Sequence, residues 1–404
     1  MTTDSRSSIQ VATQGLMQAP IQTGALVIAI SVIAIFIWLL VEQSLKQGLL
    51  LLIGLALGIS LYHATFGFTG AYRRAIVNKD ISGVVAQMVM LTLAMILFAP
   101  VLSHGTVFGH GVVGAIAPAS LSVAFGAFLF GIGMQLGDSC ASGTLYNAGG
   151  GNLRMVLVLI FFCIGSFVGS LHLLWWEAQM PSMGTIVLAD TFGWTLAIAL
   201  QIYALGSIYL VLKMLGGKVQ RDLWWGAQGF SMQRLLRGPW PLLLSAVLLA
   251  LLNYAVLLVA GHPWGVTWAF SLWAAKVAVL FGWNPASSIF WSNAFQSHAL
   301  QRPLFEDTIS ILNLGILLGA FVAAALAGKL RPKLSIPLPS LLAAVIGGLI
   351  MGYGARLAYG CNIGAFFSGV ASTSLHGWLW LVAAITGNVL GVRLRPNFGL
   401  DGFR

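Results

Sequence analysis

The sequence predicts an all-α polytopic membrane protein with an inverted internal repeat, about nine transmembrane helices and several short re-entrant half-helices. Three observations support this fold class: the composition, a series of charge-free apolar runs, and a motif that recurs at a constant offset. Of the 404 residues, 58% are hydrophobic and only 7% are charged, whereas a soluble domain carries about 25% charged residues. So few charges cannot cover a surface exposed to water.

The apolar runs approach the length of about 20 helical residues that is needed to cross the hydrocarbon core. They lie at residues 25–41, 49–62, 84–103, 155–170, 195–212, 241–260 and 309–327. Other segments are too polar or too rich in glycine to span, and we expect them to form short helices (near 64–72, 140–150, 284–300 and 361–372). A helical bundle follows because lipid cannot satisfy an open sheet edge.

Loop charges predict the orientation of the chain. The loop 213–237 holds five basic residues against one acid, whereas the loop 171–192 holds Glu177 and Asp190 with no Lys or Arg. The positive-inside rule places the first loop in the cytoplasm and the second outside. The net charge of +10 is therefore a topology signal, and nucleic-acid binding is not expected. The resulting division is a cytoplasmic tail (1–24), a first transmembrane half (25–215), a basic cytoplasmic linker (216–237), a second half (238–395) and a cytoplasmic tail (396–404).

The repeat lies in residues 126–143 and 347–364, which align without gaps at an offset of 221. Six positions are identical, namely Gly126/Gly347, Gly131/Gly352, Gly133/Gly354, Leu136/Leu357, Cys140/Cys361 and Gly143/Gly364. The helix after the first copy begins inside at Arg154, and the helix after the second copy ends inside at Arg393. The copies therefore run in opposite directions, which is typical of transporters with a site at the membrane midplane. Cys140 should enter from the cytoplasmic face and Cys361 from the outer face.

Both repeated segments have the composition of a broken helix. In the first copy, Cys140 is surrounded by small and capping residues (Ser139, Ala141, Gly143 and Thr144). In the second copy, Asn362 and Gly364 follow Cys361 in the same plan. A break of this kind exposes backbone N–H groups at a half-helix N-terminus, where they attract anions. The alternative is that the glycines only allow close helix packing.

A thiol at such a break can act as a thiolate nucleophile or metal ligand, or as a weak S–H donor to a soft atom of a ligand. Asp138, two residues from Cys140, disfavours the thiolate, so we favour the neutral S–H group. The cysteine and histidine spacings do not indicate a metal site, and we expect neither a metal nor a cofactor. Cys163 lies within an apolar run and is interpreted as a small buried hydrophobe.

Charged residues within apolar segments are functional candidates. Arg356 lies shortly before Cys361, where it would attract an anion, pair with an acid such as Asp138, or snorkel. Arg73 and Arg74 follow the glycine-containing break at 67–70. They are interpreted as positive-inside anchors, and guidance of the anion during release on the inner side stays open as the alternative.

These motifs resemble the YeeE/YedE family of bacterial sulfur-transport membrane proteins over roughly residues 48–395. The resemblance is carried by GDSCASGTLYNAGGG at 137–151, GYGARLAYGCNIG at 352–364 and FGFTGAYRR at 66–74. It implies uptake of thiosulfate across the bacterial inner membrane by a multi-pass transporter that is not an enzyme. It also implies that Cys140 and Cys361 pass the anion on through S–H contacts, and that lipid and a cytoplasmic carrier protein of the TusA type are partners.

The sequence departs from this family at Gly67, where the family commonly has a cysteine. Gly67 would then line the path of the anion without supplying a third thiol. Transport of a sulfur-containing anion is therefore better supported than thiosulfate itself, and sulfite or a selenium compound stay open as substrates. Two other classes of protein also stay open. One is a membrane thiol enzyme or persulfide relay acting through Cys140 and Cys361, and the other is a structural subunit that docks partners.

Overall fold

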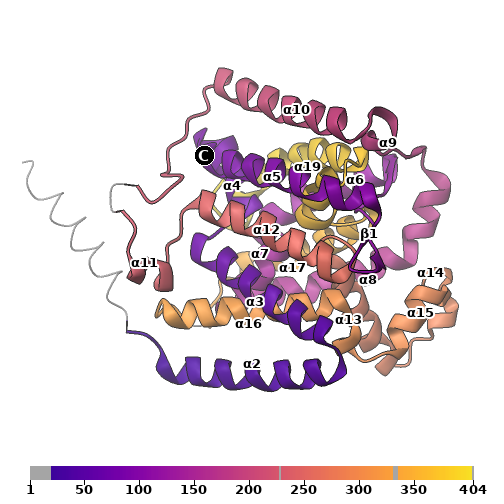
Figure 1. Cartoon of the computed structure of the whole chain (residues 1–404), viewed down its shortest axis with the longest axis horizontal. Coiled ribbons are helices and arrows are strands. Elements are labelled where there is room, and N and C mark those ends of the chain that lie inside the picture. The colour runs from indigo at the N-terminus through magenta and orange to yellow at the C-terminus, as the bar shows by residue number, and fades with distance from the viewer. Residues whose placement is uncertain (1–19, 227–228, 331–334, 403–404) are drawn as a thin grey trace, which may run out of the picture.

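The computed structural model describes residues 20–226, 229–330 and 335–402. Within them, ten helices are long and apolar enough to cross a membrane, and the strands have at most four residues (Figure 1). The predicted all-α membrane fold is confirmed, and the ten candidate spans agree with the expected number of about nine. Glycine-rich helices such as α6 and α17 are less apolar along their sequence, yet they are long enough to span. Most of the predicted tail 1–24 and the end of the tail 396–404 lie outside the described residues.

The first half of the chain forms seven helices and four short strands. The helices are α2 (Thr23–Gln43), α3 (Leu45–Ala64), α4 (Phe68–Asn78), α5 (Ser82–His104), α6 (Leu121–Gly137), α7 (Ala141–Gly149) and α8 (Leu153–Gln179). The strands pair antiparallel, β1 (Thr106–Val107) with β2 (His110–Gly111) and β3 (Pro118–Ser120) with β4 (Ser182–Thr185). A short α9 (Leu188–Phe192) leads into the second half.

The second half, from α10 to η4, follows the same order and adds several short helices between α13 and α16. Its helices are α10 (Trp194–Met214), α11 (Met232–Arg237), α12 (Leu242–Ala260), α13 (Thr267–Leu280), η1 (Pro285–Ser287), α14 (Ile289–Ser292), α15 (Ala294–Gln301), η2 (Leu304–Glu306), α16 (Thr308–Leu326), α17 (Leu338–Leu357), η3 (Asn362–Phe367), α18 (Ser368–Ala371), α19 (Leu375–Leu394) and η4 (Arg395–Phe398). The predicted short helices correspond to α4, α7, α14 with α15, and η3 with α18.

Packing follows the inverted repeat. Helix α8 packs along α17 and α6 packs along α19, while α3 packs along α16 and α5 along α12. The repeat relates α3 to α12, α5 to α16, α6 to α17 and α8 to α19. Under this exchange the contact of α8 with α17 becomes that of α19 with α6, and the contact of α3 with α16 becomes that of α12 with α5. The backbone repeats as well, because Asp138 and Tyr359, 221 residues apart, both adopt left-handed conformations with φ of 63° and 57°.

Glycines in the long helices allow the two halves to approach closely. A Cβ atom at Gly165 of α8 would lie 2.2 Å from the Leu349 carbonyl oxygen of α17. A Cβ atom at Gly131 of α6 would lie 2.2 Å from the Ala384 carbonyl oxygen of α19. The packing interpretation of glycine therefore holds for these helices, which cross as small-residue membrane helices do.

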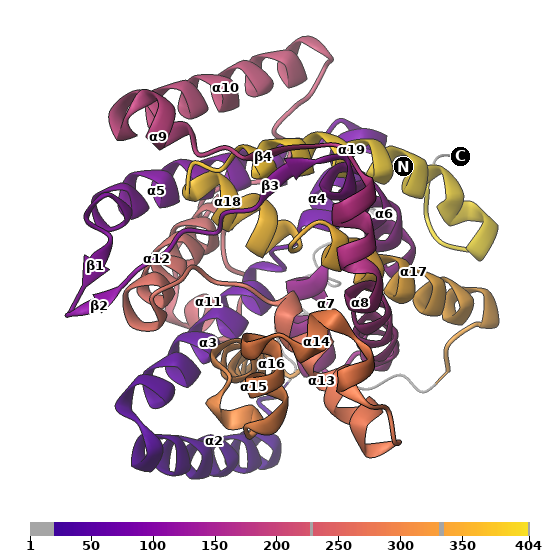
Figure 2. The ribbon, with the colours of Figure 1, turned by 90° about the vertical axis from the view of Figure 1, so that its right-hand side faces the viewer.

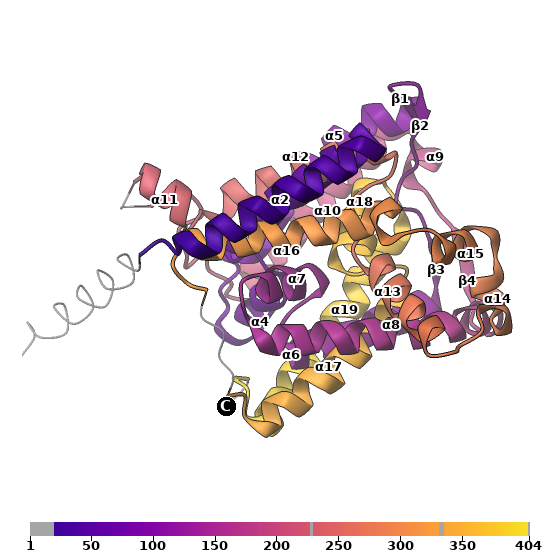
Figure 3. The ribbon, with the colours of Figure 1, turned by 90° about the horizontal axis from the view of Figure 1, so that it is seen from below.

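The two ends of the bundle differ. Helix α11 and the C-terminal end of the chain lie at one end, and the short strands with α14 and α15 lie at the other (Figure 3). We call the first the basic side, because Arg154, Lys213 and Arg393 lie there at helix ends. Helices α2 and α10 are the least buried spans and lie on opposite outer sides of the bundle (Figure 1).

A buried carboxylate organises the turn between α4 and α5 on the basic side. Asp80 is 4% exposed and accepts a hydrogen bond of 3.0 Å from the Ser82 N–H, and Arg74 Nε lies 3.5 Å from its other oxygen. Burial raises the pKa of Asp80, but the Ser82 hydrogen bonds and the Arg74 charge outweigh it, so the pKa is lowered overall. In the second half, Asp307 caps the equivalent helix α16 through the Ser310 N–H at 2.8 Å.

Candidate functional site

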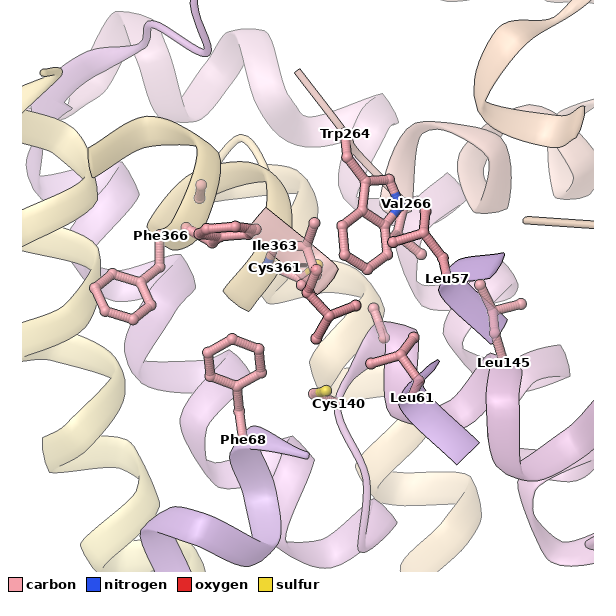
Figure 4. Packing of buried hydrophobic residues seen from close by; sticks show 14 of the residues in the cluster. Leu57, Leu61, Phe68, Cys140, Leu145, Trp264, Val266, Cys361, Ile363 and Phe366 are labelled. Carbon is pink, nitrogen blue, oxygen red and sulfur yellow. Dashed lines mark hydrogen bonds between the residues drawn. The ribbon is translucent and has the colours of Figure 1, made fainter. Parts of the chain in front are cut away.

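The two repeated cysteines lie close to each other inside the bundle, each directly before a short helix (Figure 4). Cys140 precedes α7 and Cys361 precedes η3, and each residue is 1% exposed. Helix α6 ends before Cys140 because Asp138 takes up a left-handed conformation, which Asp tolerates better than most residues. The broken-helix pattern of the sequence thus produces two half-helices that start next to the thiols.

Backbone N–H groups converge on both sulfur atoms. The N–H groups of Phe68 and Gly143 face the Cys140 thiol, and those of Ile363 and Gly364 face the Cys361 thiol, with Ile363 N at 3.4 Å from Sγ. Phe68 is the first residue of α4, so the N-termini of α4, α7 and η3 point at the same region. Helix N-termini carry a partial positive charge and free N–H donors, which suits an anion.

A polar pocket of about 110 Å³ reaches Cys140 from the basic side. We call it the Cys140 pocket. Four of the residues predicted from the sequence line it, namely Gly67, Ser139, Cys140 and Gly143. The sequence did not predict the other lining residues as part of the site, although it drew attention to Arg73, Arg74 and Asp138; these residues are Thr65, Thr69, Gly70, Arg73, Arg74, Asp138, Tyr146 and Asn147.

The mouth of this pocket is held together by Asp138. Its carboxylate pairs with Arg73 of α4 and with Arg395, whose Nη1 lies at 3.0 Å. Arg154 closes the end of α6 by donating to the Gly137 carbonyl oxygen at 2.7 Å. Around the pocket, cations outnumber carboxylates, with four arginines (Arg73, Arg74, Arg154 and Arg395) and two acids (Asp80 and Asp138). The excess of positive charge favours an anion in the pocket.

Polar side chains without partners lie beside the two thiols. Tyr72 Oη, Thr69 Oγ1 and both side-chain amide atoms of Asn362 are buried, and none has a hydrogen-bond partner among the described residues. The Tyr72 hydroxyl faces the Asn362 amide and the Cys140 thiol. An unpartnered polar group in a membrane interior costs several kcal/mol. This arrangement therefore favours a polar ligand that hydrogen-bonds to these groups.

Apolar side chains close the site on the other side. Figure 4 shows Cys361 beside Ile363, with Trp264 and Val266 on one flank and Phe366 on the other. These four side chains are at most 3% exposed. Cys361 does not line the Cys140 pocket. Cys361 is thus enclosed by apolar side chains, and a hydrophobic constriction of this kind gates membrane pores.

The remaining predicted residues have different surroundings. Ala141 and Thr144 are buried in α7, and the Thr144 hydroxyl donates to the Cys140 carbonyl oxygen at 2.8 Å. Gly364 has open space, because a Cβ atom there would meet only Gly265, at 3.8 Å. Cys163 is half-buried on α8 and packs against the core.

The structure does not bring Arg356 to the thiols. Its guanidinium stacks over Phe290, 4.8 Å from the ring centroid, and over Trp268 at 5.9 Å. Asp138, which the sequence offered as a partner for Arg356, pairs with two other arginines. Helix α17 runs away from the basic side, so its last turn carries Arg356 toward the opposite end of the bundle.

Gly67 lies in the wall of the Cys140 pocket. Its backbone is extended, with φ of −146°, so glycine is not required there by conformation. A Cβ atom would meet only Tyr146 Oη, at 3.4 Å. A small side chain at this position therefore fits and would point into the pocket.

The amino-acid sequence indicates only weakly the site residues that were not predicted from it. Thr69, Tyr72 and Arg73 directly follow the break at Gly67, and α4 turns them toward Cys140 and Asp138. The sequence interpretation assigned Arg73 to the membrane surface because a positive-inside anchor has the same local pattern. Only the ion pair with Asp138, 65 residues away, distinguishes the two interpretations.

An inverted repeat of broken helices around a buried polar site is typical of a class of membrane transporters. The chain belongs to the sulphur transport family, whose model matches residues 63–390. It is 27% identical to the thiosulfate transporter TsuA of Spirochaeta thermophila over 368 residues, which are 84% of this chain and 96% of that protein.

Two proteins of Escherichia coli are similar as well. TsuA is 26% identical over 344 residues, 83% of this chain and 91% of that protein. The probable transporter YedE is 34% identical over 163 residues, 40% of this chain and 39% of that protein. The resemblance found from the cysteine motifs is therefore confirmed.

Proposed function

We propose that this protein takes up thiosulfate across the bacterial inner membrane, with the basic side facing the cytoplasm. The observation that carries the proposal is the pair of thiols at converging helix N-termini, with unpartnered Tyr72 and Asn362 beside them. The similarity to thiosulfate transporters along most of both chains supports the choice of substrate.

The groups at this site match the two ends of thiosulfate. Its three oxygen atoms carry much of the negative charge and would accept hydrogen bonds from half-helix N–H groups and the Tyr72 hydroxyl. Its terminal sulfur is soft, and the S–H groups of Cys361 and then Cys140 would donate to it weakly. No covalent bond forms in this scheme, so the protein acts as a transporter and not as an enzyme.

Release on the basic side would depend on the arginines of the Cys140 pocket. Arg73 attracts the anion, but its pairing with Asp138 limits that attraction. A conducting site must bind strongly enough to admit an ion and weakly enough to let it leave. The sequence contains no GxxxxGK[ST] nucleotide-binding motif. Consumption of thiosulfate in the cytoplasm would then drive uptake, and a TusA-type sulfur carrier would receive the sulfur there.

Uptake of labelled thiosulfate by cells that express the protein tests this function, with sulfite and selenite as competitors. Cys140→Ala and Cys361→Ala should abolish most of the uptake, because each removes a donor at the constriction. The serine variants at the same positions should keep part of it, since an O–H group also donates. Cys163→Ala, away from the pocket on α8, is the matched control and should transport like the unmodified protein.

Two results would contradict the proposal. Equal uptake by the unmodified protein and both alanine variants would show that the thiols have no role. Detection of covalently modified Cys140 by mass spectrometry after turnover, together with complete loss of uptake in the serine variants, would instead establish a covalent thiol relay.

A further inference from the structure

A second, larger cavity of about 520 Å³ lies between α10 and the body of the protein, and neither thiol lines it. Helix α10 stands apart from the bundle (Figure 2) and packs mainly on α5 and α9. Its counterpart α2 packs on both α3 and α16. The repeat is therefore broken here, and the space that close packing would have filled is left open beside α10.

The walls of this cavity are apolar along most of its length. Helix α10 contributes Leu205, Ile208 and Leu212, and the opposite walls come from α4, α5 and α19 (Ile76, Val84, Leu91, Leu381 and Ile385). An apolar cavity of this kind does not hold water. At the depth of the bilayer, where α10 is exposed to lipid, a hydrocarbon chain is the natural occupant.

One end of the cavity is strongly basic. Lys79 lines it, and its ammonium group lies over the turn after α10, because a Cβ atom at Gly216 would be 3.3 Å from Lys79 Nζ. Lys218 is held next to it, since its N–H donates to the Lys79 carbonyl oxygen at 2.8 Å. Lys213 and Arg221 flank the same turn, and all four cations are exposed.

These four cations lack acidic partners. None of them forms an ion pair within the described ranges 20–226, 229–330 and 335–402. The adjacent Asp80 is buried and engaged by Ser82 and Arg74, and the Asp222 carboxylate lies against Gly226. Clusters of basic residues beside a hydrophobic crevice on one side of the membrane are typical of sites for anionic lipid headgroups.

We infer that this cavity binds an anionic phospholipid, with one acyl chain between α10 and α5 and the phosphate at Lys79 and Lys218. The chain would pack against Tyr72 and Phe366, which line the cavity and also border the thiol site. The inference does not depend on which anion the protein transports.

Native mass spectrometry of the full-length protein, released from detergent after incubation with phosphatidylglycerol or phosphatidylcholine, tests the inference. The unmodified protein should retain one phosphatidylglycerol and much less phosphatidylcholine. Lys79→Gln with Lys218→Gln should weaken phosphatidylglycerol binding by about five-fold for each charge removed. Ile208→Trp, which fills the chain region, should reduce retention of both lipids.

Two matched controls separate this site from general lipid contact. Lys329→Gln removes a cation near the end of α16, away from α10, and Ile28→Trp adds the same ring to the exposed face of α2; neither should change retention. Equal retention of both lipids by the unmodified protein and the variants would overturn the inference. A lipid-free dimer that Ile208→Trp dissociates would overturn it too, because a second copy would then fill the cavity.

Discussion

The two halves of this protein share a backbone plan but differ at the thiols. In the first half, Cys140 lies at the end of a polar pocket with arginines at its mouth. In the second half, Cys361 is enclosed by Trp264, Ile363 and Phe366. Duplication therefore supplies two similar helix breaks, and the side chains around each break decide whether it is open or closed.

The short helices that follow the thiols differ too. Helix α7 is a regular α-helix, whereas η3 is a π-helix. In η3, the N–H groups of Ala365 and Phe366 both donate to the Cys361 carbonyl oxygen, at 3.0 and 3.3 Å. Such π-turns are rare and often occur at functional sites, so the closed half carries the less regular backbone.

The two halves should differ most in the free energy of unfolding that is lost when the equivalent positions 138 and 359 are substituted. Asp138 joins two arginines, one of them buried, whereas the Tyr359 hydroxyl donates to Glu177 alone. Asp138→Asn should lower the free energy of unfolding by about 2 kcal/mol, because Arg395 loses its charged partner. Tyr359→Phe should cost only about 1 kcal/mol. Thermal unfolding in detergent measures both stability losses. Equal losses for the two variants would show that the two halves depend equally on these contacts.

A second comparison concerns Arg73, which the sequence indicated as a membrane anchor, and Arg356, which it indicated as a candidate to attract the anion. Arg73→Gln should reduce thiosulfate uptake by about ten-fold, because a cation at the mouth of the pocket contributes on the order of 1.4 kcal/mol to attraction of the anion. Arg356→Gln should leave uptake nearly unchanged and lower stability by about 1 kcal/mol through lost stacking on Phe290 and Trp268. Initial uptake rates at matched expression measure the first effect. A greater loss of uptake in Arg356→Gln would reverse the assignment of the two arginines.

Gly67→Cys would add a thiol to the wall of the Cys140 pocket in the first half. The extended backbone and the free space at this position predict a change in stability within about 0.5 kcal/mol. Thiosulfate uptake should rise, because a third S–H donor then lines the pocket. Gly67→Ser has almost the same size without the thiol and should raise uptake less. The proposed benefit of a thiol is disproved if the serine variant matches or exceeds the cysteine variant.

A pH-dependent effect on stability should come from the turn at Asp80 in the first half. The pKa of Asp80 is lowered in the folded protein, so its carboxylate stabilises the fold above the ordinary pKa of about 4. That stabilisation is lost as the pH falls through the lower folded value. Asp80→Asn should therefore cost about 1 kcal/mol at pH 7, and its difference from the unmodified protein should shrink below pH 4. Asp190→Asn, an exposed acid, is the control, and a difference for Asp80→Asn that does not change with pH would exclude this linkage.

The membrane class, the inverted repeat and the half-helices at Cys140 and Cys361 could all be predicted from the amino-acid order. They depend on properties that are contained in the order of the residues alone, namely long apolar runs, glycine-rich breaks and a repeated motif. Ser139 and Gly143 were found in the same way, because they neighbour a break, and Gly67 was found through the family resemblance.

Other parts of the site exist only through packing between distant segments. Arg395 reaches Asp138 across 257 residues, Tyr72 faces Asn362 from another half-helix, and Arg356 is carried away from Cys361 by the direction of α17. The cavity beside α10 lies where that helix packs on α5 and the short α9, whereas its counterpart α2 packs on the two long helices α3 and α16. In each case the partner of a side chain depends on how whole helices cross, and the local sequence around that side chain does not contain this information.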